Sequence, residues 1–305
     1  MAGIPDLRPR GLGGFDVDAD RRLALELEAK RRSCSFADLL RIYWRAHPGV
    51  PPKLADRFVR GDLIGADRAE EVLRSIDELA EGNIADDAVV IEVGCGTASL
   101  GSEVARRVAA VVASDVSLAW LVLARARAEA AGLDNLELVA CTGDQLPFDE
   151  GVFDLAVAAD VIEHVPDASA LVASMHRVLR PGGVAWLSTP NRLSLTPEPH
   201  VRLFGVGLLP RRAALAYVRI RRGVDYGSIR TLTLWRLRGL LEGYGGRSTV
   251  VAPEIPAPVR RAYGGFARRL IAAYDRLRRL PITGRIVLVV APLFHASLKR
   301  EASVA

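Results

Sequence analysis

From residue 88 onward, short apolar runs alternate along the chain with segments of helical composition. The first run, residues 88–93 (AVVIEV), is bounded by turn residues, and similar runs follow at residues 109–113, 136–139, 153–159 and 184–188. Continuous apolar runs of this length are typical of parallel strands, because both faces of such a strand are buried. Strands that alternate with helices predict βαβ units and therefore an α/β fold with a doubly wound sheet.

The apolar run at residues 286–293 is expected to complete this sheet as its seventh strand, and residues 248–251 as its sixth. A long segment rich in proline, glycine and arginine follows the fifth strand and is read as an insertion. The expected helices are residues 100–108, 116–131, 168–179, 232–241 and the very basic 259–280.

The chain is accordingly divided into four parts. Residues 1–17, rich in glycine and proline, are expected to be a flexible tail. A helical N-terminal extension over residues 18–87 has expected helices at 18–32, 35–46, 53–60 and 66–79. The α/β domain comprises residues 88–191 and 230–300, interrupted by the insertion at 192–229.

The charge is divided unevenly between the two halves of the chain. Residues 1–191 carry 20 Lys and Arg against 30 Asp and Glu, whereas residues 192–300 carry 21 against 5. This asymmetry indicates an anionic partner near the C-terminal half, such as a membrane surface touched peripherally. The alternative is a solvated surface in an arginine-rich protein, and nucleic acid is disfavoured because no aromatic-rich stacking motif accompanies the charge.

Three separated cysteines without C-x-x-C spacing argue against a disulfide framework and a structural zinc site. The first twenty residues contain no apolar segment of a secretory signal. The run at 286–293 is too short to cross a bilayer, which takes about 20 residues. These features predict a cytoplasmic protein, either soluble or peripheral to the membrane.

The segment Glu92-Val-Gly-Cys-Gly-Thr-Ala98 follows the first strand directly. Gly94 and Gly96 permit a tight turn and a close approach of a ligand to the backbone. Because position 99 is serine, the spacing departs from G-x-G-x-x-G, which counts against a nicotinamide dinucleotide site. The alternative reading is a plain connection between a strand and a helix.

Acidic residues follow the next three strands. Asp115, 21 residues after Gly94, is placed to accept hydrogen bonds from ribose hydroxyls, or to cap the next helix. Asp144, beside Gln145, is placed to bind the amine of adenine, or is part of an ordinary turn. Asp160, Glu163 and His164 end the fourth strand, where His164 suits a general base, or a loop histidine bonded to backbone.

In this order, these segments resemble class I S-adenosylmethionine-dependent methyltransferases, in particular the methyltransferase type 11 group. The resemblance rests on VIEVGCGTASLG, SDVS, GDQLPFDEGVFDLAVAADVIEHVPD and LRPGGVAWLSTPN, within residues 88–191. It implies a Rossmann-like sheet with S-adenosyl-L-methionine as cofactor. It also implies cofactor contacts, in which Glu92, Gly94, Cys95 and Gly96 hold the methionine part, Asp115 and Val116 the ribose, Asp144 and Gln145 the adenine, with Asp160 nearby.

The stretches EHVPD and STPNR also resemble the ubiquinone-biosynthesis O-methyltransferases. That resemblance implies a divalent metal held by an acid-x-x-Glu-His arrangement, matched here by Asp160, Glu163 and His164, and magnesium suits such oxygen ligands. The alternative, a polar loop without metal, is the reading adopted here.

The insertion is the expected recognition element for the methyl acceptor, because loops beyond the carboxyl edge form the mouth of such sites. Its arginines suit anionic groups and its apolar residues suit a lipid-like or quinone-like molecule. We therefore predict O-methylation of a small or lipid-like acceptor. The alternatives are a C- or N-methyltransferase of the same fold, a nucleic-acid-binding methyltransferase and an inactive scaffold. The polar candidates are His200, Arg202, Arg211, Arg212, Tyr217, Arg219, Arg221 and Arg222.

Overall fold

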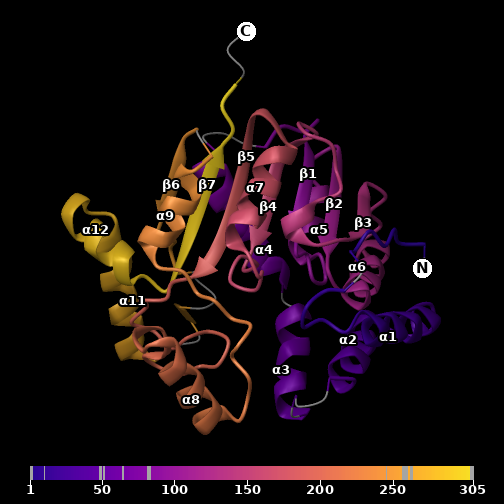
Figure 1. The fold of residues 1–305 in the computed structure, drawn as a ribbon, viewed down its shortest axis with the longest axis horizontal. Coiled ribbons are helices and arrows are strands. Elements are labelled where there is room, and N and C mark those ends of the chain that lie inside the picture. Colours follow the sequence, from indigo (N-terminus) through magenta and orange to yellow (C-terminus); the bar gives the residue numbers. More distant parts are fainter. Residues whose placement is uncertain are drawn as a thin grey trace.

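A seven-stranded sheet forms the centre of the computed structural model, in the order β3-β2-β1-β4-β5-β7-β6 (Figure 1). Strands β1 to β5 are parallel, and β7 runs antiparallel to both β5 and β6. The predicted α/β class and doubly wound seven-stranded sheet are therefore confirmed. The strands are β1 Val89–Val93, β2 Ala110–Asp115, β3 Leu136–Ala140, β4 Phe153–Ala159, β5 Leu179–Pro190, β6 Ser248–Val251 and β7 Leu293–Lys299. The structure describes residues 3–9, 11–47, 50, 52–63, 65–80, 84–244, 246–255, 260–261 and 264–302.

Helices cover both faces of this sheet because successive strand residues point to opposite sides. Val90 packs in one cluster with α4 and α5, whereas its neighbour Ile91 packs in another with α7 and α9. Helix α6 lies beside α5 against β2 and β3. The bounds are α4 Gly65–Leu79, α5 Ser99–Ala105, α6 Leu118–Ala130, α7 Ala168–Val178 and α9 Leu234–Glu242.

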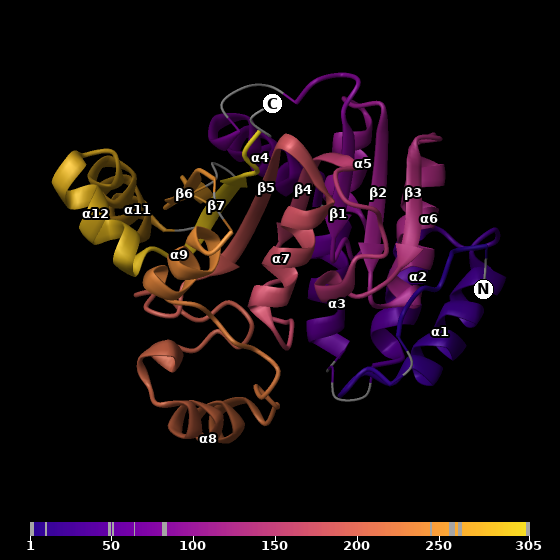
Figure 2. The same ribbon diagram turned by 45° about the horizontal axis from the view of Figure 1, so that its top comes forward.

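Helices α1 (Val17–Lys30), α2 (Phe36–Arg45) and α3 (Pro52–Leu63) precede α4 in the N-terminal extension. Ser35 begins α2 because its hydroxyl accepts the hydrogen bond of the Asp38 amide, as at a typical N-cap. Helices α1 and α2 pack on α6 through apolar residues that include Leu27 and Leu40. Both ribbon views show α1 to α3 beyond the end of the sheet at which the parallel strands finish, and α8 (Arg211–Arg222) of the insertion there as well (Figures 1 and 2).

The expectation of a flexible tail is corrected for those of its residues that the structure describes. Residues 3–9 run along the edge strand β3, where Ala140 donates to the carbonyl of Pro5 and accepts from the amide of Leu7. Ile4 is buried in the same cluster as α1 and α2. An edge strand offers unpaired backbone groups, and these residues satisfy some of them.

The expected seventh strand at 286–293 is wrong. Most of that run lies in α12 (Pro281–Val290), and the strand is β7, which begins after Pro292. A short apolar run does not distinguish a strand from a helix by itself, and Pro281 at the first turn favours the helix. The basic helix expected at 259–280 is α11 (Gly265–Arg278), and Val259 lies outside the described residues.

The segment expected as an insertion leaves the sheet after β5 and contains the short helix η2 (Val206–Leu208) and α8 (Arg211–Arg222). It has a small apolar core of its own, which includes Leu203, Val218 and Tyr226. Among the described helices of the chain, none has the length and apolar character needed to span a membrane.

Candidate functional site

The glycine turn after β1 is bent through three left-handed residues. Gly94, Gly96 and Ala98 have φ values of +69°, +52° and +49°. A Cβ atom on Gly94 would lie 2.5 Å from Cγ2 of Val161, so only glycine allows the turn to lie against the segment that follows β4. The same position on Gly96 is open. The turn thus lies between β1 and β4, where the strand order reverses and ligands of such sheets bind.

Asp115, at the end of β2, fixes the shape of this turn. One carboxylate oxygen accepts from the amide of Gly96 at 2.9 Å, and the other accepts from the amide of Ser117 at 2.8 Å. Burial raises the pKa of Asp115 to about 6, although these amides oppose the shift. Each carboxylate oxygen has a second lone pair, so the bonds leave acceptor capacity for ribose hydroxyls.

The carboxylate of Glu92 is directed to α5 rather than to the open side of the glycine turn. Its carboxylate accepts from the amide of Gly101 in the first turn of α5 at 2.9 Å, and burial raises its pKa to about 8. Cys95 is also buried, and its amide donates to the carbonyl of Ser114. Burial raises the pKa of the Cys95 thiol as well, so this thiol is a packing group in the turn. A contact between Glu92 and the methionine part of the cofactor stays a prediction.

An ion-pair network from the N-terminal segment holds the loop after β2. Asp20 of α1 accepts from the Ser117 hydroxyl at 2.6 Å and from the Leu118 amide at 2.9 Å. Arg8 donates to Asp20 at 2.7 Å and to the carbonyl of Val116 at 2.9 Å. These residues were missed in the sequence, because no local pattern joins Arg8 and Asp20 to a loop about one hundred positions later.

The helical extension also closes against the glycine turn itself. Arg127 of α6 donates to the carbonyl of Thr97 at 3.0 Å and to the carbonyl of Asp62, at the end of α3, at 2.7 Å. Tyr43 of α2 stacks near Trp120 with ring centroids 4.1 Å apart. Burial, and then the charge of the nearby Asp115, raise the pKa of the Tyr43 hydroxyl. The extension is therefore part of the wall of the candidate cofactor site.

Asp144 and Gln145 lie on the short helix η1 (Gly143–Gln145), after β3. A Cβ atom on Gly143 would come within 2.8 Å of the side chain of Val93, so η1 lies directly against the end of β1. Asp144 is partly exposed and Gln145 is exposed. Both are placed beside the glycine turn, as their predicted contact with adenine requires.

Asp160 ends β4 in a left-handed conformation with φ of +56°. Its carboxylate accepts from the hydroxyl of Ser188 on β5 at 2.8 Å, and its amide donates to the carbonyl of the same residue at 3.1 Å. Non-glycine residues adopt this conformation rarely, and aspartate is one of the types that do so more often. This conformation turns the chain so that the next residues, including Val161, face the glycine turn.

Glu163 is fully buried beneath His164. One of its carboxylate oxygens accepts from the hydroxyl of Thr189 at 2.9 Å. The other has no hydrogen-bond partner among the described residues and lies 3.9 Å from Nε2 of His200. Burial, and then the charge of Asp160, raise the pKa of Glu163 to about 7.

His164 pairs with a histidine from the insertion. Nε2 of His164 lies 3.2 Å from Nε2 of His200, and Nδ1 of His200 lies 2.5 Å from the carboxylate of Glu198. Burial and the neighbouring His200 lower the pKa of His164. Burial also lowers the pKa of His200, but the hydrogen bond and charge of Glu198 outweigh it and raise the pKa overall. Sequence reasoning named His200 only as a substrate contact and missed Glu198.

Ligand atoms of Glu163, His164 and His200 all lie within 4.8 Å of one another, a spacing that a metal ion could bridge. This set differs from the one that the sequence suggested, since Asp160 is bonded to Ser188 and is not part of it. The nitrogen-rich set also suits zinc better than magnesium.

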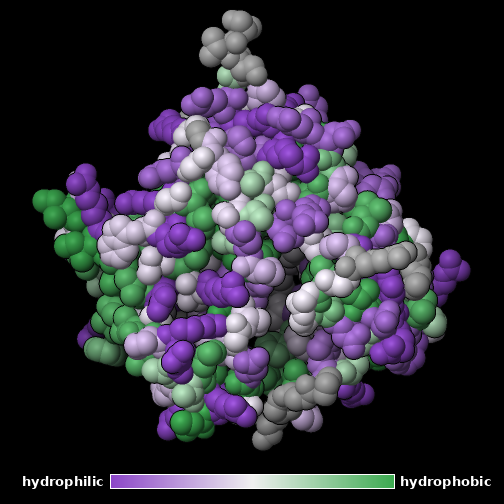
Figure 3. All heavy atoms as spheres, in the orientation of Figure 1, coloured by the Kyte–Doolittle hydropathy of each residue, from purple (hydrophilic) through white to green (hydrophobic). Residues whose placement is uncertain are grey.

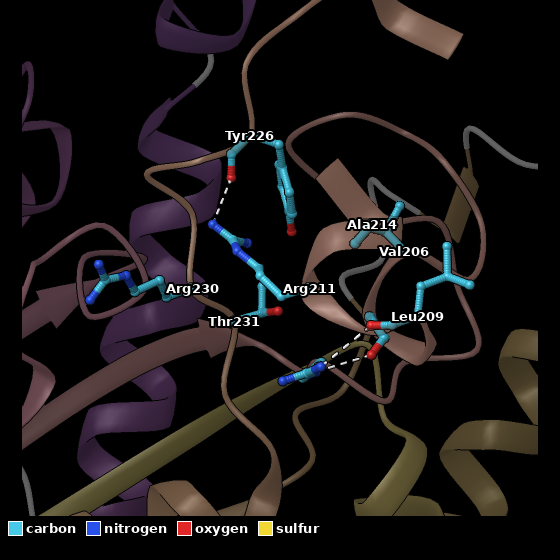
Figure 4. Close-up of a pocket in the computed structure, with 9 residues that line it drawn as sticks. Val206, Leu209, Arg211, Ala214, Tyr226, Arg230 and Thr231 are labelled. Carbon is cyan, nitrogen blue, oxygen red and sulfur yellow. Dashed lines mark hydrogen bonds between the residues drawn. The ribbon is translucent and has the colours of Figure 1, made fainter. Parts of the chain in front are cut away.

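A hollow of about 270 Å³ lies between the insertion and the end of β5 (Figure 4). Arg211 reaches across it and donates to the carbonyls of Tyr226 and Ile229, while Arg192 donates to the carbonyl of Gly207. Arg230 donates to the carbonyl of Pro166. These guanidinium groups hold the insertion together. For Arg211, which the sequence suggested as an anion ligand, the geometry favours this structural role.

The comparisons with known proteins agree with this arrangement. Residues 91–187 match the family described as a methyltransferase domain. The chain contains a class I methyltransferase domain. Domains of this class use S-adenosyl-L-methionine, as predicted. The ubiquinone biosynthesis O-methyltransferase of Pseudomonas paraeruginosa is 34% identical over 118 residues, which are 38% of this chain and 48% of that protein. The chain thus spans about half the length of the curated relatives that it matches.

Solved structures share the fold of this methyltransferase domain at low sequence identity. An S-adenosylmethionine-dependent methyltransferase from Mesorhizobium loti has a TM-score of 0.51 and 21% identity, covering 76% of this chain and 98% of its own. A phosphoethanolamine N-methyltransferase of Haemonchus contortus, in complex with S-adenosylhomocysteine, has a TM-score of 0.53 and 15% identity, covering 76% and 53%. These likenesses concern the fold alone.

Proposed function

We propose that this chain transfers the methyl group of S-adenosylmethionine to a hydroxyl oxygen of a small or lipid-like acceptor. The observation that carries the choice of oxygen is the pair of His164 and His200 at the carboxyl edge, beside the turn and loops of the cofactor site. A hydroxyl must lose its proton as it attacks, whereas a neutral amine attacks without a base. The O-methyltransferase relative supports the same choice.

S-adenosylmethionine supplies an electrophilic methyl group on a sulfonium sulfur. The acceptor oxygen forms a bond to the methyl carbon as the bond from carbon to sulfur breaks, and the electron pair of that bond stays on sulfur. Nδ1 of His164 takes the hydroxyl proton, because its Nε2 bears the hydrogen directed at His200. The chain's main contribution is to align the two reactants and exclude water.

Together, Glu198 and His200 provide a second acceptor for the proton that His164 removes. While His200 is neutral, Glu198 fixes its tautomer by accepting from Nδ1, so Nε2 of His200 is an acceptor for the hydrogen on His164. Once His200 is protonated at lower pH it can no longer accept that hydrogen, and its charge adds to burial in lowering the pKa of His164. The pKa of His200 is raised and that of His164 is lowered, so transfer from His164 to His200 is favourable.

The hollow beside the insertion is our candidate for the non-reacting part of the acceptor. Its wall includes the apolar Val206, Leu209 and Ala214 as well as Tyr226. Burial, and then the charge of the nearby Glu198, raise the pKa of the Tyr226 hydroxyl. The amide of Arg230, which also lines it, donates to the carbonyl of Glu163. Two residues that line the hollow therefore contact the surroundings of the histidine pair, Tyr226 at Glu198 and Arg230 at Glu163. Such a lining suits an apolar molecule with few polar groups.

The test is calorimetric titration with S-adenosylhomocysteine, followed by a screen of phenols, quinols and lipid-linked sugars for S-adenosylhomocysteine release. We expect cofactor binding and turnover of a hydroxyl acceptor, with turnover lost in His164→Asn while binding stays. Failure of the folded chain to bind S-adenosylhomocysteine would overturn the proposal. Turnover of amines alone would overturn the assignment to oxygen.

A further inference from the structure

The helices α11 and α12 present their apolar side chains outward. Phe266, Leu270 and Leu277 of α11 recur at a spacing of four and seven residues, so they form one stripe along the helix, and all three are exposed. Ile282 and Ile286 of α12 are exposed too. Phe266 and Ile282 keep 77% and 78% of their surface accessible, so the stripe and its continuation on α12 form an exposed apolar surface.

Polar contacts on the inner face fix this orientation. Asp275 is buried and pairs with Arg278 at 3.4 Å and with Arg260 at 3.1 Å. Tyr274 donates to the carbonyl of Pro253 at 2.8 Å, and Ile271 is buried on the same side. Helix α11 therefore cannot turn its stripe inward without breaking a buried ion pair, which is strongly unfavourable.

Arginines border the stripe. Arg269 and Arg276 lie on one flank of α11, and Arg285 comes between the two exposed isoleucines in the sequence of α12. All three are exposed, and within the described part of the chain no carboxylate lies within ion-pair distance of them. Asp275 is the single acidic residue from 265 to 290, against six arginines.

These two helices follow β6 and precede β7 in the chain, and they lie at the edge of the sheet opposite to α1 and α2 (Figures 1 and 2). The space-filling view shows apolar side chains gathered along that edge, interrupted by hydrophilic ones (Figure 3). This apolar and basic surface lies away from the candidate cofactor site.

We propose that the exposed face of α11 and α12 docks on a bilayer that contains anionic phospholipids. Apolar residues that enter the boundary between headgroups and acyl chains, with arginines directed to the lipid phosphates, are what such an interfacial element requires. Charge complementarity favours an anionic membrane over a second copy of the chain. A symmetric dimer through this face would place the arginines of two copies against one another, which is repulsive. The inference does not depend on the methyl acceptor.

Flotation of the full chain with phosphatidylcholine vesicles, with and without phosphatidylglycerol, tests this proposal. Binding is expected only to vesicles that contain phosphatidylglycerol, and it should fall at high salt. Phe266→Ser and Ile282→Ser should each weaken partitioning by about ten-fold. Arg269→Gln and Arg276→Gln should each weaken it by about five-fold. S-adenosylhomocysteine binding by each variant shows that it is folded.

Leu25→Ser is the matched control, because Leu25 is exposed on α1 at the opposite edge of the sheet and should leave partitioning unchanged. Ile220→Ser tests the insertion, since Ile220 is exposed on α8. Absence of binding to anionic vesicles at low salt overturns the proposal. So does binding that Ile220→Ser abolishes but Phe266→Ser leaves intact, or a dimer in light scattering that Phe266→Ser dissolves while vesicles are not bound.

Discussion

Nε2 of His200 and Nε2 of His164 lie 3.2 Å apart, although the two residues belong to different segments of the chain. His164 follows β4, whereas His200 comes from the insertion after β5. The insertion therefore contributes chemistry to the candidate site as well as covering it. Because each histidine changes the charge that the other meets, the pH dependence of the reaction should report on the pair.

Replacing His200 should move the acidic limb of the rate profile. His164 acts as a base only when neutral, and its pKa is lowered by burial and then by the charge of His200. In His200→Asn the second cause is gone, so the pKa of His164 rises and the acidic limb of kcat moves to higher pH. His164→Asn should lower kcat by about 10²–10⁴-fold at all pH values. Initial rates across pH measure both effects.

The control for this pair is His176→Asn, because His176 lies on α7 outside the candidate site. We expect its pH profile to match that of the original chain. A metal at Glu163, His164 and His200 would give a different result, in which zinc raises the melting temperature of the original chain but not of His200→Asn. That outcome would contradict a proton relay between the two histidines.

The strands of the sheet and the acidic residues at their ends were predictable because the signals are local. A buried parallel strand is largely apolar, and β1 to β4 each contain such a run. Because neighbouring strands of the sheet are parallel, their carboxyl ends lie at the same edge of the sheet. The positions of Asp115, Asp144 and Asp160 then follow from the topology without knowledge of any contact.

The partners of these residues were not predictable, because they depend on tertiary packing. Glu198 was not expected beside His200 and Tyr226, nor Arg8 beside Asp20, since single charged residues in loops have no periodic signal. The apolar run in α12 shows the opposite failure. This run is strongly apolar, a pattern that fits either a strand or a helix. In the structure it forms a helix that packs, half-exposed, beside α11.

Asp115→Ala should weaken S-adenosylhomocysteine binding about 10- to 150-fold, the usual cost of losing hydrogen bonds to a charged group. The carboxylate holds the amides of Gly96 and Ser117, so its loss relaxes the turn as well as removing an acceptor for ribose. Calorimetric titration measures the change. Asp134→Ala, in the loop before β3, is the matched control, and an equal loss of affinity in both variants would refute a specific role for Asp115.

Arg8→Met should destabilise the fold by about 3–5 kcal/mol, because it leaves Asp6 and Asp20 without a buried partner. Urea unfolding measures this cost. Arg21→Met is the control, since Arg21 also pairs with Asp6 but is more exposed, and it should cost about 1 kcal/mol or less. Equal effects of the two variants would show that the N-terminal segment is not anchored through Arg8.

Glu163 should make the stability of the fold depend on pH in an unusual direction. Its pKa is raised from 4.5 to about 7 by burial and then by the charge of Asp160, so the folded state keeps a proton that the unfolded state has lost. The free energy of unfolding therefore falls as pH rises from about 4.5 to 7, by on the order of 3 kcal/mol. Glu163→Gln keeps an oxygen for Thr189 and carries no charge, so its stability should fall less steeply over that window, where the raised pKa values of Asp115 and Glu92 still act, and should exceed that of the original chain at pH 8. Urea unfolding of both proteins across this range measures the difference, with Glu103→Gln on α5 as the control for a partly exposed carboxylate. Parallel curves for the original chain and Glu163→Gln would show that Glu163 is ionised in the folded protein and balanced by a positive charge, for which His200 is the nearest candidate.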